Sequence, residues 1–459
     1  MRHVLVMAST GAVGLVAVFA VDLLNLFYIS LLGQKPIAAA VGFAGVVGFL
    51  QTSVAIGLMI GISAVVSRAI GAGQMDVARR IATGSLIVLS ALMLLLGLLT
   101  VAVLGPLLDL LGAAGETREL AASFLRITSP SLPLVATGMC LSGLLRSVGD
   151  ARRAMNVTLV AAFVTAGVDP ILIFVLHLGL TGAAISTVLS RCVLLGMGWY
   201  GAMHVHRLLG RFDGAALAGD LRAVFKVAGP AVLTNLATPV GASYVTHSMA
   251  AFGTAAIAGQ ATIDRISPVA FGLVYALSGA VGPILAQNMG AGRTDRVNAT
   301  LRDSLIFAAS AVLAAWAILA AAQSWVVLAF SAQGETALLI RLFCSWLAAS
   351  FLFTGALFVA NAAFNNLGFP LLSTLFNWGR ATLGTIPFVT IGAGYGPQGV
   401  LIGQAAGSVL FGLAAVLVAF RVVGRLAGVV APTHAGAHPL VGGSGQAALA
   451  LATARAADD

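Results

Sequence analysis

Charged residues are scarce in this chain, and their scarcity excludes a soluble protein. Asp, Glu, Lys and Arg make up 8% of the 459 residues, whereas hydrophobic residues make up 59% and the mean hydropathy is +1.03. A water-soluble domain of this size could not cover its surface with so few charges. We therefore expect almost the whole chain to lie in a lipid bilayer.

The chain also lacks the residue patterns of metal sites and of enzymes that act on lipids. Its three cysteines, Cys140, Cys192 and Cys344, lie far apart inside apolar runs, which is typical of small buried hydrophobic residues. The histidines show no ligand spacing, and two adjacent Asp residues occur only at Asp458 and Asp459. We expect no metal, no cofactor and no catalytic residue, so a membrane-embedded enzyme is a disfavoured alternative.

Long apolar runs are what the chain has instead. Each run has about 20 residues or more, enough for a helix to cross the hydrocarbon core of a membrane. They cover residues 8–31, 37–68, 81–108, 119–145, 154–176, 179–204, 223–250, 255–287, 303–330, 337–364, 370–392 and 398–424. The sequence thus predicts an all-α polytopic membrane protein with twelve transmembrane helices.

The second half of the chain repeats motifs of the first half. Ser67–Asp76 reads SRAIGAGQMD, and Ala286–Asp295 reads AQNMGAGRTD. Six helices per copy is an even number, so both copies insert the same way up, related by a pseudo-twofold axis along the membrane normal. We expect a six-helix lobe over 1–204, a cytoplasmic linker over 205–222, a second six-helix lobe over 223–425 and a disordered tail over 426–459. Such a repeat indicates a secondary transporter that works in a central cleft between its lobes.

The positive charges indicate how the helices are oriented. Arginines and lysines gather in the even-numbered connections and near the termini. They are Arg68, Arg79, Arg80, Arg146, Arg152, Arg153, Arg207, Arg211, Arg222, Lys226, Arg293, Arg296 and Arg302, with Arg380 a little beyond the tenth connection and Arg2, Arg421 and Arg425 near the ends. The positive-inside rule places both termini in the cytoplasm. The net charge of +9 therefore reports topology in a multi-pass inner-membrane protein and not a nucleic-acid surface.

Two carboxylates in the first half are the strongest candidates for a site. Asp22 in the first helix, Asp169 in the fifth and Thr187 in the sixth each lie roughly 12–14 Å below the outer surface, at 1.5 Å per helical residue. Intramembrane carboxylates are costly and mark ion pathways, and two close carboxylates can share a proton near neutral pH. Pro170 would loosen the fifth helix beside them. The alternative is that each Asp only joins helices by hydrogen bonds.

Other intramembrane polar residues favour structural roles. Asp264 and Arg265 are neighbours in the eighth helix and point about 100° apart, so they do not pair well with each other. We expect Arg265 to reach another helix and Asp264 to balance it or Arg341 in a structural ion pair. We expect the same structural role for Arg126 and Arg191. Asn361 and Asn365 lie on one face of the tenth helix. With Met59 and Met249 they could line an adaptable substrate cleft, or they could simply belong to the helix packing.

These motifs resemble the multidrug and toxic compound extrusion (MATE) family over about residues 1–425. The residues that carry the resemblance are Gly33 with Ala38-Ala39, Gly71-Ala72-Gly73 with Ala78-Arg79, Arg146 with Gly149-Asp150, Asp169-Pro170, Gly179 with Gly182-Ala183-Ala184, Ala256-Ile257-Ala258, Arg265, Gln287-Asn288, and Gly290-Ala291-Gly292 with Arg296. The resemblance implies a monomeric antiporter that exports amphipathic, cationic compounds in exchange for protons or sodium ions.

The resemblance is closer to the DinF-like branch of that family. It implies an ion-coupling set of Asp22, Asp169 and Thr187, with Thr165 at the position where the branch has Asn. The carboxylates of NorM-like members fall at Thr238 and about Thr354, which implies that a second-lobe cation site is absent. No proline precedes Pro36, which disfavours a proline bend in the first helix. A lipid-linked precursor flippase is the alternative within transport, disfavoured by the few basic residues inside the membrane.

Overall fold

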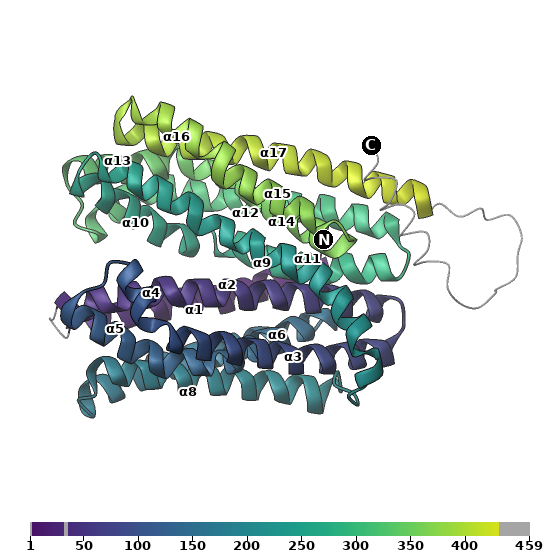
Figure 1. The fold of residues 1–459 in the computed structure, drawn as a ribbon. Helices are drawn as coiled ribbons and strands as arrows, with labels where there is room; N and C mark the ends of the chain where they lie inside the picture. Colours follow the sequence, from purple (N-terminus) through teal and green to yellow (C-terminus); the bar gives the residue numbers. More distant parts are fainter. Residues whose placement is uncertain (1, 32–34, 431–459) are drawn as a thin grey trace, which may run out of the picture.

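The structure is a computed structural model that describes residues 2–31 and 35–430, and every regular element in these ranges is a helix. The first lobe contains α1 (Arg2–Leu31), α2 (Lys35–Gly71), α3 (Met75–Ala102), α4 (Leu104–Leu110), α5 (Gly115–Thr128), α6 (Leu132–Ser147), α7 (Ala151–Pro170) and α8 (Gly179–Trp199). The second contains α9 (Gly214–Ala250), α10 (Thr254–Ala270), α11 (Gly272–Gly290), α12 (Thr294–Ala329), α13 (Gly334–Ser345), α14 (Phe351–Leu367), α15 (Pro370–Gly379), α16 (Ile386–Ala393) and α17 (Gly396–Val430). Figure 1 shows the two lobes side by side with their helices running lengthwise.

Most of the expected membrane segments are continuous helices. Ten described helices are long and apolar enough to cross a membrane. The expected segment 255–287 is the pair α10 and α11, bent by 52°. The expected segment 370–392 is broken into α15, a π-helical turn η5 (Arg380–Gly384) and α16. Pro387 at the start of α16 explains that break, because proline has no N–H for the helical hydrogen-bond ladder. The prediction of a two-lobed, all-helical membrane fold is confirmed.

The connection between the lobes is shorter than expected. A π-helical turn η3 (Tyr200–Val205) ends the first lobe, and α9 already begins at Gly214, inside the predicted linker 205–222. The helix begins there because the Asp213 side chain accepts hydrogen bonds from the backbone N–H groups of Ala215 and Ala216. We call residues 206–213 the linker, the end of the molecule at which it lies the linker end, and the opposite end the far end.

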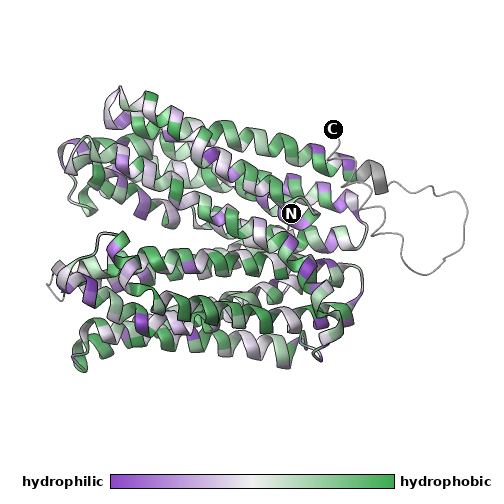
Figure 2. Cartoon of the chain, viewed as in Figure 1, coloured by the Kyte–Doolittle hydropathy of each residue, from purple (hydrophilic) through white to green (hydrophobic). Residues whose placement is uncertain are grey.

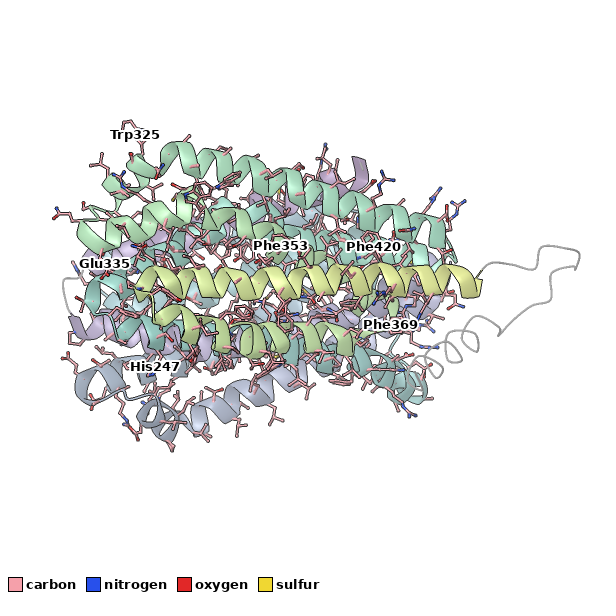
Figure 3. All side chains as sticks on the ribbon, turned by 90° about the horizontal axis from the view of Figure 1, so that it is seen from above. His247, Trp325, Glu335, Phe353, Phe369 and Phe420 are labelled. Atoms are coloured by element: carbon pink, nitrogen blue, oxygen red, sulfur yellow. The ribbon has the colours of Figure 1, made fainter. Side chains whose placement is uncertain are left out.

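The chain alternates between these two ends. α2 begins at the far end and reaches the linker end at Gly71, and α11 does the same in the second lobe, ending at Gly290. In Figure 3, Trp325 and Glu335 lie towards one end and Phe369 towards the other. In Figure 2, hydrophobic residues predominate along the helices. Helix α17 extends past residue 426, where the tail was expected to begin, and the remainder of that expected tail lies outside the described residues.

The first helix packs against both lobes. α1 packs against α7 in its own lobe and against α11 in the other. Val4, Met7 and Ala8, near its start, are buried in one cluster with Leu277 and Leu357 of the second lobe. The lobes therefore share a hydrophobic core at the linker end. α1 is unbroken over its 30 residues, as expected from the absence of proline.

Candidate functional site

The repeated glycine motifs meet each other across the seam between the lobes. A Cβ atom added to Gly71 would lie 2.1 Å from the carbonyl oxygen of Gln287. A Cβ atom added to Gly290 would lie 2.1 Å from the carbonyl oxygen of Arg68. Because Arg68 and Gln287 each precede a glycine of the repeat by three residues, the two contacts are equivalent under the pseudo-twofold axis. We call this pair of contacts the glycine latch.

Two hydrogen bonds with the same symmetry reinforce the glycine latch. Arg68 Nη2 donates to the carbonyl oxygen of Asn366 at 2.8 Å. The Gln287 side chain donates to the carbonyl oxygen of Ser147. Ser147 ends α6 and Asn366 lies at the end of α14, so the acceptors are also repeat equivalents. Both bonds connect one lobe to the other, which closes the seam at the linker end.

The glycines of α2 show where this helix lies closest to the second lobe. Along α2, Gly57 and Gly61 lie so close to Val232 and Ala228 of α9 that an added Cβ would approach them within 2.4 and 2.6 Å. By contrast, an added Cβ at Gly42, Gly45 or Gly48 would meet no atom within 4 Å. The lobes thus touch over the half of α2 nearest the linker end and have no close contact at these three glycines nearer the far end.

Asp169 is a buried carboxylate without hydrogen bonds of normal geometry. It lies in the last turn of α7, directly before Pro170, and its residue is 1% exposed. Within the described part of the chain, neither carboxylate oxygen has such a partner. The neighbouring group on α8 is the hydroxyl of Ser186, which is also buried without a partner of its own. Because an unpaired buried polar group is costly, this pair is a place where a proton or a cation would be stabilised.

Asp22 lies in a different environment from Asp169. It is exposed at the surface of α1, which packs beside α7, and no hydrogen bond or ion pair joins it to Asp169 among the described residues. Thr187 and Thr165 donate their hydroxyl protons to the backbone of their own helices, at Ala183 and Ala161 respectively. The helices expected to form the site are adjacent, but the four side chains make no direct hydrogen bonds to each other.

Ser186 was not among the predicted site residues. The prediction favoured its neighbour Thr187, which bonds to its own helix at 2.9 Å. Adjacent residues on a helix point about 100° apart, so only one of the two can face Asp169. The signal available in the sequence was a serine, a residue with a hydrogen-bonding hydroxyl, inside an apolar helix next to the expected position.

The predicted ion pairs of Asp264 are absent from the described residues. Its carboxylate accepts a hydrogen bond from Gln260 Nε2 at 2.9 Å, one turn earlier on α10. Arg265 and Arg341 are both exposed, and neither forms a salt bridge in the described ranges. The prediction was wrong because an amide one turn away already satisfies the carboxylate, while Arg265 points to a different side of the helix.

Arg191 and Arg126, the other two arginines predicted to lie inside the membrane, differ from each other. Arg191 on α8 donates to the carbonyl oxygen of Thr128 at 2.5 Å and to the hydroxyl of Ser131 at 2.7 Å. Thr128 precedes the 3-10 turn η1 (Ser129–Ser131) and Ser131 ends it. The hydrogen bonds from Arg191 therefore stabilise the junction between α5 and α6. Arg126 is exposed on α5.

Three of the four residues predicted to line the substrate cleft are buried in this structure. Met249 is fully buried in the core of the second lobe, and Met59 packs partly buried against the core of the first. Because it is fully buried, Met249 does not line a cleft. The sequence could not show this, since a helix that is apolar on every side has no pattern that indicates which side faces inward. Asn361 and Asn365 are buried on α14, and in the described structure their side-chain carbonyl oxygens have no hydrogen-bond partner.

Arg380 lies in the middle of a membrane segment and not beside a connection. It begins the π-helical turn η5, ten residues after the start of α15, and its Nε is buried without a partner in the part of the chain described. Tyr275 on α11 is within electrostatic reach of both Arg380 and Asp264. The Tyr275 ring also meets Phe358 of α14 at 5.4 Å and Phe19 of the first lobe at 6.5 Å between centroids. The second lobe thus carries charged and aromatic groups at its seam with α1.

A polar cluster outside the membrane segments anchors the linker. Asp150 caps α7 by accepting from the backbone N–H of Arg153, and His206 Nε2 lies 2.7 Å from its other oxygen. Burial disfavours the charge of Asp150, but the hydrogen bonds from His206 and Arg153 outweigh burial and hold the pKa of Asp150 below its ordinary value. The linker therefore starts from a fixed point on the first lobe.

Two lobes of membrane-spanning helices, joined by a symmetric latch at one end and carrying unpaired polar groups inside, define a two-lobed membrane transporter. Residues 12–171 and 230–391 match the MatE family, and the chain belongs to this family. Its members are transporters, so the expectation that the chain is not an enzyme is confirmed. The closer assignment to the DinF-like branch stays a prediction.

Individual relatives span nearly the whole chain. It is 29% identical over 437 residues to a protein named FAD transporter from Shewanella oneidensis, covering 92% of this chain and 94% of the relative. It is 28% identical over 435 residues to a probable multidrug resistance protein NorM from Deinococcus radiodurans, covering 91% and 94%. The crystal structure of the Vibrio cholerae MATE transporter VcmN in the bent form superposes with a TM-score of 0.87 at 23% identity, over 93% of this chain and 97% of that one. The structural likeness shows the fold alone.

Proposed function

We propose that the chain is a proton-coupled antiporter that exports amphipathic compounds by alternating access. The observation that supports coupling in the first lobe is the buried carboxylate of Asp169, which has no hydrogen-bond partner of normal geometry. A protonated carboxyl group is neutral and can stay buried, whereas a carboxylate has to be paired or exposed to water. Loading and releasing one proton at Asp169 would therefore favour different arrangements of α7 and α8.

Asp22 supplies the step of this proposal that precedes protonation of Asp169. Because Asp22 lies at the surface of a helix that packs on both α7 and α11, its charge would influence the seam itself. Protonation from the outer side would neutralise Asp22 first and Asp169 second. The same oxygen ligands, with the hydroxyl of Ser186, would suit a sodium ion as the alternative coupling ion.

The linker end is proposed to face the cytoplasm. The linker carries Arg207 and Arg211, and Arg79 and Arg80 lie beside it at the start of α3, as the positive-inside rule requires. The glycine latch then closes the cytoplasmic side of the seam. Alternating access requires this latch to separate in each transport cycle.

The proposal is tested by efflux of a fluorescent lipophilic cation from a drug-sensitive host in sodium-free buffer. Asp169→Asn should abolish efflux that depends on the proton gradient, because the amide cannot release a proton. Asp264→Asn is the matched control, since Asp264 is an intramembrane carboxylate that already has a hydrogen-bond partner. Full efflux by Asp169→Asn at equal expression would overturn proton coupling at this residue, and efflux restored only by sodium would reassign the ion.

A flavin nucleotide is the second candidate substrate, and Arg380 is the observation that favours it. Its guanidinium group, close to Tyr275, could hold an anionic group while the aromatic residues at the seam contact a planar ring. The relative from Shewanella oneidensis is named as a FAD transporter. Flavin fluorescence in the medium of expressing cells, compared with an Arg380→Gln variant, separates the candidates. Flavin release lost only in the variant supports this substrate, and no release by either protein rejects it.

A further inference from the structure

A cavity of about 580 Å³ lies at the linker end, outside the seam between the lobes. The linker forms one wall, and the first turns of α3 form the other. Its charged lining consists of Arg79, Arg80, Arg207, Arg211, Asp76 and Asp213. Four guanidinium groups and two carboxylates around one cavity leave an excess of positive charge.

Of the two carboxylates in the lining, one caps a helix and the other forms only a weak surface ion pair. Asp213 uses its side chain to cap α9. Arg80 forms a bidentate ion pair with Asp220 of α9, at 3.0 and 3.1 Å, so this arginine is satisfied. Arg79 pairs with Asp76 at 3.3 Å, but the Asp76 side chain is 98% exposed, and such a surface pair contributes little.

Among the described residues, Arg207 and Arg211 are the two arginines of this lining that form no ion pair. Both are exposed, and within the described residues neither side chain has an acidic partner or a hydrogen bond. Leu209 and Phe212, between and beside them, complete the lining with apolar surface, and Phe212 is 54% exposed. The cavity therefore offers guanidinium donors next to exposed hydrophobic surface at the end of the membrane helices.

We propose that this cavity binds the phosphate head group of an anionic lipid. Arginine clusters hold phosphate by charge-assisted hydrogen bonds, and basic pockets at the cytoplasmic ends of membrane helices suit anionic head groups. The exposed Phe212 and the adjoining Leu209 suit the glycerol and the first methylene groups of a lipid. A soluble phosphate ester has the same recognition chemistry, and the experiment below separates the two sources.

The bound lipid connects the linker to the first lobe. The linker is already fastened to α3, since Arg79 Nε donates to the carbonyl oxygen of Arg207 at 2.8 Å and the Gly210 N–H donates to the hydroxyl of Thr83 at 2.9 Å. A phosphate contacting both Arg79 and Arg211 adds a third link at the start of α9. The lipid thereby stabilises the junction of the lobes.

The experiment measures binding to the purified full-length protein in detergent. Short-chain dihexanoyl phosphatidylglycerol is titrated against the wild type and against the double variant Arg207→Gln/Arg211→Gln, with the dissociation constant and the thermal unfolding midpoint as readouts. Since each surface arginine contributes about 1 kcal/mol to anionic lipid binding, the double variant should bind roughly 30-fold more weakly. Arg152→Gln/Arg222→Gln removes the same charge from exposed positions outside the cavity and should bind as the wild type does.

Two further titrations identify the source of the phosphate. Dihexanoyl phosphatidylcholine should raise the unfolding midpoint little, because its head group has no net charge. Glycerol 3-phosphate without acyl chains should bind weakly if the lipid is the ligand, and equal binding by it reassigns the site to a soluble phosphate. Equal affinity of the wild type and Arg207→Gln/Arg211→Gln for phosphatidylglycerol overturns the site altogether. An Arg207→Lys/Arg211→Lys variant that recovers most of the affinity excludes misfolding as the cause of a loss.

Discussion

Alanine at Gly71 or at Gly290 should force the closed end of the transporter apart. Each added Cβ would lie 2.1 Å from a carbonyl oxygen of the other lobe, whereas ordinary contacts begin at 3.4 Å. The backbones therefore have to separate by at least about 1.3 Å, the difference between these distances. The lobes can meet this demand by opening at the linker end, which is the motion that alternating access requires.

The cost of this overlap sets the expected change in population. Overpacking a tight contact costs roughly 1–3 kcal/mol, which corresponds to about a 5- to 150-fold shift between two conformations. Each single variant should move the equilibrium from the closed linker end towards the open one. Because the two contacts are equivalent under the pseudo-twofold axis, Gly71→Ala and Gly290→Ala should have similar effects.

Spin-label distances across the seam measure this shift. Labels at Gln74→Cys and Arg293→Cys, in a background without native cysteines, mark exposed and repeat-equivalent positions beside the latch. The variants should gain a population with a longer label distance. Gly45→Ala is the control, because it lies on the same α2 helix as Gly71 but an added Cβ meets nothing within 4 Å. Unchanged distance distributions in both latch variants would refute the argument that these glycines hold the lobes together.

Three further outcomes follow from the packing and the linker anchor. Gly407→Ala should lower the unfolding midpoint strongly, because its Cβ would lie 1.8 Å from the carbonyl oxygen of Gly384, whereas Gly424→Ala on the same helix has open space and should be neutral or stabilising. Arg191→Met should cost about 1–3 kcal/mol by removing the two hydrogen bonds that the guanidinium group donates to Thr128 and Ser131, measured as a lower unfolding midpoint with unaltered proton coupling in any folded fraction. Asp150→Ala should lower the unfolding midpoint at pH 7. Because the pKa of Asp150 in the folded state is below the ordinary 3.8, the wild type keeps its full stability advantage over the variant above pH 3.8. It loses that advantage as the pH falls through the folded-state pKa. A wild-type advantage that persists undiminished at the lowest pH would contradict the assigned role of Asp150.

The repeat was visible in the sequence, but the glycine latch was not. Matching SRAIGAGQMD with AQNMGAGRTD predicted two lobes in the same orientation. It did not predict that Gly71 and Gly290 touch each other's lobe, because nothing in a one-dimensional pattern shows how far an element lies from the axis that relates its copies. Residues that sit on a pseudo-twofold axis necessarily meet their own equivalents, and only the packing of α2 against α11 places the motif there.

Which side of each helix faces the protein interior was harder to predict than where the helices lie in the sequence. Hydropathy found the segments, because each has to be apolar over about 20 residues. It could not distinguish the buried side of α9 that carries Met249 from a side lining a cleft, nor show that Arg380 falls within the membrane segment. Such a segment has no amphipathic pattern to orient it, since both lipid and protein interior accept apolar side chains. For the same reason, the sequence could not show that Ser186 and not Thr187 lies beside Asp169.

The glycine latch is symmetric, whereas the polar groups inside the two lobes differ, and this combination would let one opening motion couple an ion to a substrate. The latch treats both lobes alike, through Gly71 and Gly290, so neither lobe can open at the linker end without the other. The interiors differ, with an unpaired carboxylate at Asp169 in the first lobe and an unpaired guanidinium Nε at Arg380 in the second. A ligand shifts an equilibrium only as far as it binds one state better than the other. An ion in one lobe and a substrate in the other, each favouring a different state of the same latch, would therefore compete without ever touching, and that competition is what exchange across a membrane requires.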